Sequence, residues 1–171
     1  MSLEKKTLKL KTGALRKPTR EKISSLLRRL YNVDSSKYVP STLRYVCLNK
    51  DPCIIYGSKL DIGDLTVLYE DSWIALYTKK RFVPSISIVQ SIYSDHGIKS
   101  AIIVKEQGVK AFLYGNDILP DSVIDTIPPI GELITVIDST DGEIVGFVTW
   151  NPRRRIYENI FDIGLFLRKL G

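Results

Sequence analysis

The sequence of 171 residues is short of the side chains that most metal and catalytic sites require. It holds one histidine, His96, and two cysteines, Cys47 and Cys53. Zinc sites draw on sets of histidine and cysteine, and many activated nucleophiles need a histidine beside them. We therefore expect no metal site and no histidine-assisted nucleophile, and we interpret His96 as a linker residue.

The glycine-rich loops that bind nucleotide phosphates are also missing. No G-x-x-x-x-G-K-[ST] motif occurs, and no G-x-G-x-x-G opens a helix. Carboxylates could still meet in space, for instance Asp117, Asp121 and Asp125, but these lie in a turn-rich stretch where aspartate normally caps helices and closes turns. The sequence predicts a protein that is not an enzyme and has no cofactor.

Long apolar runs are absent as well. None approaches the ~20 residues that span a bilayer, and the basic start M-S-L-E-K-K-T-L-K-L-K lacks the apolar core of a signal peptide. We expect a cytoplasmic protein without a membrane partner. Cys47 and Cys53 flank a turn, so a cross-strand bridge is conceivable, but we favour their interpretation as two small apolar residues.

The net charge of +6 is unevenly distributed along the chain. Residues 1–35 carry ten lysines and arginines against three acidic residues, whereas residues 98–171 carry eight against ten. Five of those eight lie near the C-terminus: Arg153, Arg154, Arg155, Arg168 and Lys169. Two separate basic surfaces are therefore expected, and a basic surface indicates an anionic partner, nucleic acid first.

The first half of the chain predicts a helix followed by strands. After Pro18, Thr19 can act as an N-cap, and leucine and isoleucine follow at helical spacing. The outer face of this amphipathic helix shows four basic residues: Arg20, Lys22, Arg28 and Arg29. The runs T-L-R-Y-V-C-L and C-I-I-Y-G predict one hairpin, and D-L-T-V-L-Y-E with W-I-A-L-Y-T predicts a second. The stretch S-I-S-I-V-Q-S-I-Y after Pro84 fits either a helix or a strand by its period, and we favour a short helix because proline suits a first turn.

The polar D-H-G at 95–97 is the predicted domain boundary. Beyond it we expect strands at A-I-I-V-K, V-K-A-F-L-Y-G, E-L-I-T-V-I and E-I-V-G-F-V-T-W. A final helix should follow, with Asp162 as its N-cap and its end at Gly171. The fold class that follows is α+β: an N-terminal α/β domain at 1–95 and a small β-barrel with a terminal helix at 96–171.

The segment W-N-P-R-R-R-I-Y contains the most specific basic cluster. Pro152 cannot donate to a strand ladder, so the arginines should lie on a connection after a strand. A solvated turn and a phosphate contact both stay open, and we favour phosphate, because guanidinium groups bind it bidentately.

Two stretches carry a family resemblance. F-L-Y-G-N-D-I-L at 112–119, with the later I-V-G-F-V, resembles the core of a PUA domain, an RNA-binding module. N-P-R-R-R-I-Y-E-N-I-F-D-I-G-L-F-L-R at 151–168 is similar to the C-terminus of one PUA family, the nuclear-import-protein-seven group of ribosome biogenesis factors and its archaeal relatives.

The resemblance implies a non-enzymatic RNA-binding factor that acts on precursor rRNA in large-subunit biogenesis, with affinity for uridine-rich single strands in some relatives. The paired arginines of the archaeal relatives match Arg154 and Arg155, whereas two of their lysine positions fall on Glu158 and Phe161. Arg153 can compensate for the lost charge, and Tyr157 can offer a stacking face.

Two other function classes stay open at this point. One is a protein–protein adaptor in an RNA-processing complex, and the other is an accessory subunit of an RNA-modifying enzyme. Ribosome-assembly or RNA-processing proteins are expected partners in each case.

Overall fold

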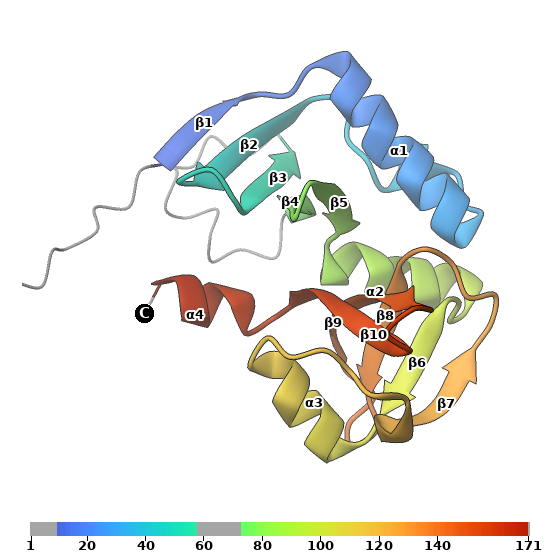
Figure 1. The fold of residues 1–171 in the computed structure, drawn as a ribbon. Helices are drawn as coiled ribbons and strands as arrows, with labels where there is room; N and C mark the ends of the chain where they lie inside the picture. Colours follow the sequence, from blue (N-terminus) through green and yellow to red (C-terminus); the bar gives the residue numbers. More distant parts are fainter. Residues whose placement is uncertain (1–9, 58–72, 171) are drawn as a thin grey trace, which may run out of the picture. The chain divides into compact units, whose positions relative to one another are not determined.

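The computed structural model describes residues 10–57 and 73–170, which form two five-stranded sheets and four α-helices (Figure 1). In chain order the elements are β1 (Leu10–Ala14), α1 (Lys17–Tyr31), β2 (Leu43–Leu48), β3 (Cys53–Gly57), β4 (Trp73–Thr78), β5 (Arg81–Pro84), α2 (Ile86–His96), β6 (Ala101–Val104), α3 (Glu106–Leu113), β7 (Val123–Ile127), β8 (Ile134–Asp138), β9 (Ile144–Asn151), β10 (Ile156–Asp162) and α4 (Leu165–Leu170). No helix in these ranges has the length and apolar character needed to cross a membrane.

The chain divides into two compact units. The first comprises Met1–Ser25 and Asp34–Ser85, and the second comprises Leu26–Val33 and Ile86–Gly171. The predicted boundary at 95/96 falls at the C-terminal end of α2, whereas the units divide before this helix. The reason is that α2 packs on β9 of the second unit through an apolar face, on which Val89 and Ile92 are fully buried.

The first unit contains an antiparallel sheet in the strand order β1-β2-β3-β4-β5. The predicted hairpin of β2 and β3 is confirmed. W-I-A-L-Y-T forms β4 and pairs with β5 across a turn in which Lys79 and Lys80 take positive φ angles of 48° and 63°. Its predicted partner D-L-T-V-L-Y-E, residues 64–70, lies outside the described residues.

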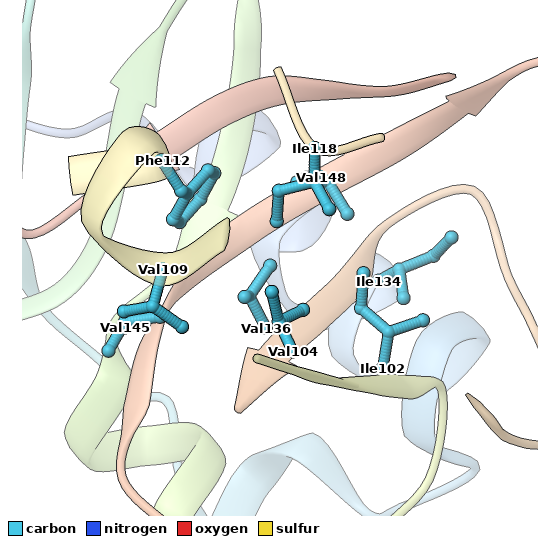
Figure 2. Close-up of a cluster of buried hydrophobic side chains, with 9 residues drawn as sticks. All are labelled: Ile102, Val104, Val109, Phe112, Ile118, Ile134, Val136, Val145 and Val148. Carbon is cyan, nitrogen blue, oxygen red and sulfur yellow. The ribbon is translucent and has the colours of Figure 1, made fainter. Parts of the chain in front are cut away.

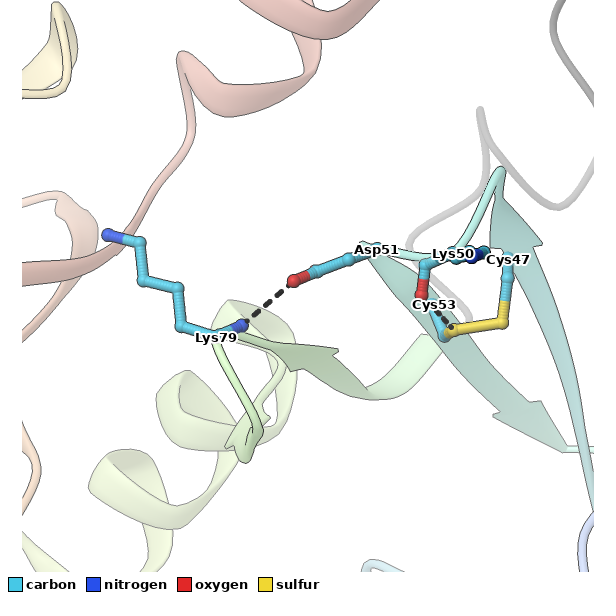
Figure 3. The surroundings of a disulfide bond; sticks show 5 residues. All are labelled: Cys47, Lys50, Asp51, Cys53 and Lys79. Atoms are coloured by element: carbon cyan, nitrogen blue, oxygen red, sulfur yellow. Dashed lines mark hydrogen bonds between the residues drawn. A yellow bond between two sulfur atoms is a disulfide. The ribbon is translucent and has the colours of Figure 1, made fainter.

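The two cysteines form a disulfide, so their interpretation as unpaired apolar residues is wrong (Figure 3). Antiparallel pairing places Cys47 directly opposite Cys53, with the Cα atoms 3.9 Å apart. Asp51 in the intervening turn accepts a hydrogen bond from the backbone N–H of Lys79 at 3.1 Å. This bond joins the β2–β3 turn to the β4–β5 turn.

Helix α1 begins earlier than the sequence suggested. Thr19 is not an N-cap but lies inside the helix, and its backbone N–H donates to the carbonyl of Arg16 at 3.0 Å. Pro18 belongs to the first turn, where proline is favoured because its φ is already helical. The predicted apolar stripe is confirmed, since Ile23, Leu27 and Leu30 are all buried.

The second unit is built on a mixed sheet in the order β10-β9-β8-β6-β7, in which only the β6–β8 pair of the described strands is parallel. The strands expected at A-I-I-V-K, E-L-I-T-V-I and E-I-V-G-F-V-T-W are confirmed as β6, β8 and β9. An isolated bridge between Ile118 and Tyr157 adds the segment after α3 to β10.

The strand expected at V-K-A-F-L-Y-G is wrong, because this stretch lies mostly in helix α3. Val109 and Phe112 project from one face of α3 into a core formed with β6, β8 and β9 (Figure 2). Burying such side chains contributes roughly 1.5–3 kcal/mol each. A Cβ on Gly108 would come within 2.7 Å of Val104 and Ser122, so glycine permits the close approach of this helix to β6.

The final helix also differs from the expectation. Asp162 ends β10 and is not an N-cap, because α4 begins only at Leu165. The predicted end of the helix at Gly171 lies outside the described residues. The Asp162 carboxylate is buried and serves other contacts, which are part of the site below.

Candidate nucleic-acid interface

The arginine triplet occupies the tight turn between β9 and β10, as predicted from Pro152. The Asn151 side-chain oxygen accepts hydrogen bonds from the backbone N–H groups of Arg153 and Arg154, both at 3.0 Å. Arg155 closes the turn with a positive φ of 54°. All three arginines of the turn are exposed.

Arg154 is held by two carboxylates. Its guanidinium lies 3.3 Å from Asp117 and 3.4 Å from Glu158. Glu158 also accepts a 2.7 Å hydrogen bond from the side-chain amide of Asn151. Glu158 therefore holds both Arg154 and the base of the turn.

Arg153 and Arg155 differ from Arg154 in their surroundings. Both side chains are exposed, and neither has a hydrogen-bond or ion-pair partner within residues 10–57 and 73–170. An unpaired guanidinium gives up no protein contact when it meets a phosphate, and its planar donors match two phosphate oxygens. These two residues are the cations of the turn that are available to an anion.

An aromatic pair lies directly beside the turn. Tyr157 on β10 is opposite Trp150 on β9, and their ring centroids are 4.8 Å apart. Trp150 remains 39% exposed, whereas Tyr157 is half-buried and packs against the core. We did not predict Trp150 from the sequence, although counting the hairpin register back from Pro152 would have placed it opposite Tyr157.

The stretch F-L-Y-G-N-D-I-L connects α3 to β10. Asn116 donates its side-chain N–H to the carbonyl of Ala111 at 3.0 Å, and Ile118 exchanges two backbone hydrogen bonds with Tyr157, each of 2.9 Å. Asp117 accepts from the backbone N–H of Asn159 at 2.9 Å, while its other oxygen faces Arg154. This segment thus supports the hairpin from behind.

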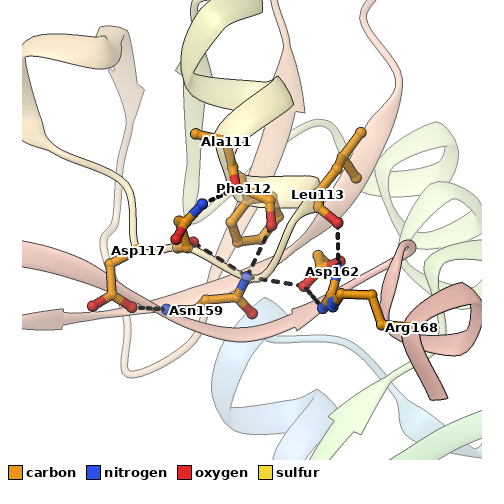
Figure 4. Close-up of polar contacts among 8 residues, drawn as sticks. Ala111, Phe112, Leu113, Asp117, Asn159, Asp162 and Arg168 are labelled. Atoms are coloured by element: carbon orange, nitrogen blue, oxygen red, sulfur yellow. Dashed lines mark hydrogen bonds and ion pairs between the residues drawn. The ribbon is translucent and has the colours of Figure 1, made fainter.

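Arg168 has a structural partner in Asp162 (Figure 4). Its guanidinium donates to both carboxylate oxygens, at 2.9 and 2.8 Å, and also to the carbonyl of Leu113. The hydrogen bonds from Arg168 to Asp162 raise the pKa of Arg168 above its ordinary value. Asn159 donates to the same carboxylate at 2.9 Å, so Asp162 is surrounded by donors.

Two further residues were considered near the C-terminus: Phe161, at a position where the resemblance implies a lost lysine, and Lys169, which was predicted to contact RNA. Phe161 is buried and stacks on Phe147 with ring centroids 6.4 Å apart, so it supports the sheet. Lys169 belongs to α4, and its side chain lies outside the described part of the structure. The described patch therefore consists of Arg153, Arg155, Trp150 and Tyr157, with Arg154 as their support.

The basic residues predicted on α1 are also unequal. Arg20 donates to the carbonyl of Pro40 at 2.8 Å, and Arg29 is paired with Glu132. Lys22 and Arg28 are exposed, and the described residues provide neither with an ion-pair partner. Half of the expected helical surface is thus engaged within the protein.

The side chains considered for catalysis do not assemble within the described ranges. Asp117 holds the hairpin, Asp125 accepts from the backbone N–H of Thr126, and Lys105 donates to the carbonyl of Asp121. His96 is exposed at the end of α2. Residues 10–57 and 73–170 contain no cluster of three or more histidine, cysteine or acidic side chains arranged to hold a metal.

Comparison with known proteins shows that the part of the chain containing this hairpin is similar to a known domain family. Residues 100–171 match the family described as the UPF0113 PUA domain. No curated protein matches the chain.

Solved archaeal structures share the fold at low sequence identity. A hypothetical protein from Pyrococcus horikoshii OT3 is 14% identical, with a TM-score of 0.61 and 81% of each chain covered. A conserved PUA domain protein from Thermoplasma acidophilum is 15% identical, with a TM-score of 0.53, covering 81% of this chain and 79% of that one. A PUA domain from Aeropyrum pernix K1, solved as a tartrate complex, is 15% identical with a TM-score of 0.61, covering 95% of this chain and 91% of that one. Residues 100–171 are therefore similar in sequence to a PUA domain family, and the chain shares its fold with these archaeal proteins.

Proposed function

We propose that this protein is a non-enzymatic, cytoplasmic RNA-binding factor that acts on precursor rRNA in the biogenesis of the large ribosomal subunit. The observation that carries the proposal is the pair of unpartnered cations, Arg153 and Arg155, beside the Trp150–Tyr157 rings on one hairpin of a PUA domain. The ribosomal assignment rests on the resemblance of residues 151–168 to the nuclear-import-protein-seven group.

The chemistry of the hairpin suits single-stranded RNA. Guanidinium groups neutralise backbone phosphates, and an exposed indole offers a face on which a base can stack regardless of its identity. Arg154 contributes by fixing the turn, because its guanidinium is already shared between Asp117 and Glu158. Affinity should therefore depend on salt more than on sequence.

Salt-dependent binding to a uridine-rich oligonucleotide tests the hairpin. Replacing Arg153 and Arg155 together by alanine removes two phosphate contacts, so the slope of log K against log salt should flatten by about 1.4. A charge-matched control, Arg28→Ala with Lys99→Ala, removes two cations elsewhere in the second unit and should leave most of the slope intact. A slope that flattens in the control and not in the hairpin variant would place the RNA elsewhere.

The ribosomal role requires a cellular measurement. RNA crosslinked to the protein in cells should be enriched in rRNA precursors, and this enrichment should fall in the Arg153→Ala, Arg155→Ala variant. Protein partners that are retained after RNA binding is lost, with no precursor enriched in either form, would instead support the adaptor hypothesis. His96→Ala should leave both measurements unchanged, because the residue has no catalytic partner among the described side chains.

A further inference from the structure

The first unit carries an aromatic pocket that the hairpin site does not involve. The pocket lies between the N-terminal half of α1 and one face of the first sheet and has a volume of about 310 Å³. That size is at the lower end of the ~300–1,000 Å³ typical of small-molecule sites. Its lining includes Lys22, Tyr45, Cys47, Cys53, Tyr77 and Phe82.

Strand register aligns the floor of this pocket. Lys11, Cys47, Cys53, Tyr77 and Phe82 are consecutive partners across all five strands. Directly paired residues lie on the same face of a sheet, so this row forms a continuous strip. The disulfide joins two members of the strip covalently, and the rings of Tyr77 and Phe82 lie with centroids 5.0 Å apart.

The next row on the same face adds a third ring. Tyr45 is paired with Gly13 on one side and Ile55 on the other. A Cβ placed on Gly13 would meet the Tyr45 hydroxyl at 2.9 Å, so the glycine leaves room for the ring to lie over β1. Because the sheet sets the positions of all three rings, the platform exists before any ligand arrives.

The polar groups at the pocket have no partners in the described ranges. Neither the hydroxyl of Tyr45 nor that of Tyr77 makes a hydrogen bond there, and the Lys22 ammonium is exposed without an ion pair. Tyr45, Tyr77 and Phe82 are only partly buried. The pocket therefore offers flat apolar faces with donors at their rim.

The surrounding charge selects among ligands that have a flat ring. Across the described residues of the first unit, eleven lysines and arginines stand against three acidic residues, Glu21, Asp34 and Asp51. A neutral or basic peptide would gain little from such an environment, whereas a nucleotide offers both a ring to stack and a phosphate for a cation.

We propose that this pocket binds one nucleotide of a single-stranded RNA, with the base stacked on Tyr77 beside the inclined ring of Phe82 and the phosphate near Lys22. The site is independent of the hairpin in the PUA domain and would give the chain a second point of contact with RNA. The proposal stands whether or not Arg153 and Arg155 contact phosphate.

Photocrosslinking of the full chain locates the contact. A uridine oligonucleotide of about eight nucleotides, within the ~4–16 of single-strand sites, carries one 5-iodouridine, and crosslinked peptides are mapped by mass spectrometry. The expected result is a crosslink to Tyr45, Tyr77 or Phe82 that persists when Arg153 and Arg155 are both alanine. Crosslinks confined to residues 100–171 would overturn the proposal.

Affinity measurements on matched variants provide the second test. Tyr77→Leu should weaken binding by about 5- to 100-fold in the Arg153→Ala, Arg155→Ala background, because a stacked base loses its platform. Tyr77→Phe retains the ring and should bind nearly as well as the parent, which separates stacking from misfolding. Lys22→Gln should flatten the salt slope by about 0.7, whereas Lys17→Gln on the same helix should not.

Binding of a proline-rich peptide tests the alternative that the pocket is a peptide site. If Tyr77→Leu leaves oligonucleotide affinity unchanged but abolishes binding of a proline-rich peptide, the pocket is a peptide site and the nucleotide proposal is wrong. If the peptide does not displace the oligonucleotide, and oligonucleotide binding is lost in Tyr77→Leu but kept in Tyr77→Phe, the proposal holds.

Discussion

The carboxylate of Asp162 is only 1% exposed and accepts two hydrogen bonds from the Arg168 guanidinium, at 2.9 and 2.8 Å. This bidentate pair joins the end of β10 to helix α4. Removing one partner of a buried pair leaves an uncompensated charge, which is strongly destabilising. Arg168→Ala should therefore lower the free energy of unfolding by about 3 kcal/mol, as measured by urea denaturation.

A double-mutant cycle is the control for this prediction. Asp162→Asn removes the buried charge, so adding Arg168→Ala to that variant should cost much less than Arg168→Ala alone. RNA affinity of the folded Arg168→Ala protein should stay close to that of the parent. Additive losses of stability, or a loss of affinity without a loss of stability, would contradict a structural role for the pair.

Arg168 also illustrates why the site could be predicted only in part from the sequence. Its charge and its place near the C-terminus indicated an RNA contact, but the partner that engages it is an aspartate whose burial depends on β9, β10 and α3 packing together. The turn at Pro152 was predictable because the lost backbone donor is a local property of proline. Trp150 became a site residue only through the hairpin register.

The fold shows the same division between local and tertiary control. Runs rich in β-branched and aromatic residues between turn signals predicted β2, β3, β8 and β9. The helix α3 was missed because V-K-A-F-L-Y is rich in β-branched and aromatic residues, which favour strands. Val109 and Phe112 also fit helical spacing, and the packing space beside Gly108 decides between the two.

The disulfide between Cys47 and Cys53 should stabilise the first sheet. It closes a short loop, with a sequence separation of six, for which chain entropy gives about 2 kcal/mol. Cys53→Ser should lower the free energy of unfolding by up to that amount in oxidising buffer. With reductant present, the parent and the variant should unfold at the same urea concentration, and a difference that persists would indicate that packing, not the bond, is responsible.

A buried tyrosine, Tyr31, and a half-buried one, Tyr93, predict a loss of stability in alkali. Burial raises the pKa of Tyr93 to about 12, and burial together with the nearby Tyr93 raises the pKa of Tyr31 still further. Their rings meet edge to face with centroids 6.0 Å apart. The Tyr93 hydroxyl donates to the Lys99 carbonyl at 2.6 Å and shares a second hydrogen bond of 2.7 Å with the Thr135 hydroxyl.

The sign of the effect follows from the order of the pKa values. Above pH 10 the unfolded phenols ionise while the folded ones stay protonated, so the unfolded state binds fewer protons and stability falls as pH rises. Each phenol should lower the free energy of unfolding by about 1.4 kcal/mol per pH unit between pH 10 and 12. Tyr93→Phe should make the decline shallower by one such contribution, and an unchanged slope in urea titrations over this range would refute the assignment.

The division of the chain before α2 makes a prediction about fragments. Val89 and Ile92 of α2 are fully buried, and Ile88 is nearly so. A fragment that begins at Ile98 loses these three side chains, each worth roughly 1.5–3 kcal/mol of burial, and exposes the surface of β9 that they cover. A fragment that begins at Ile86 retains them.

Neither fragment contains Tyr31, so both should be less stable than the full chain, but the longer one should melt cooperatively and at a higher temperature. Equal melting temperatures in calorimetry would show that α2 adds no stability to the second unit and would support a boundary at 95/96.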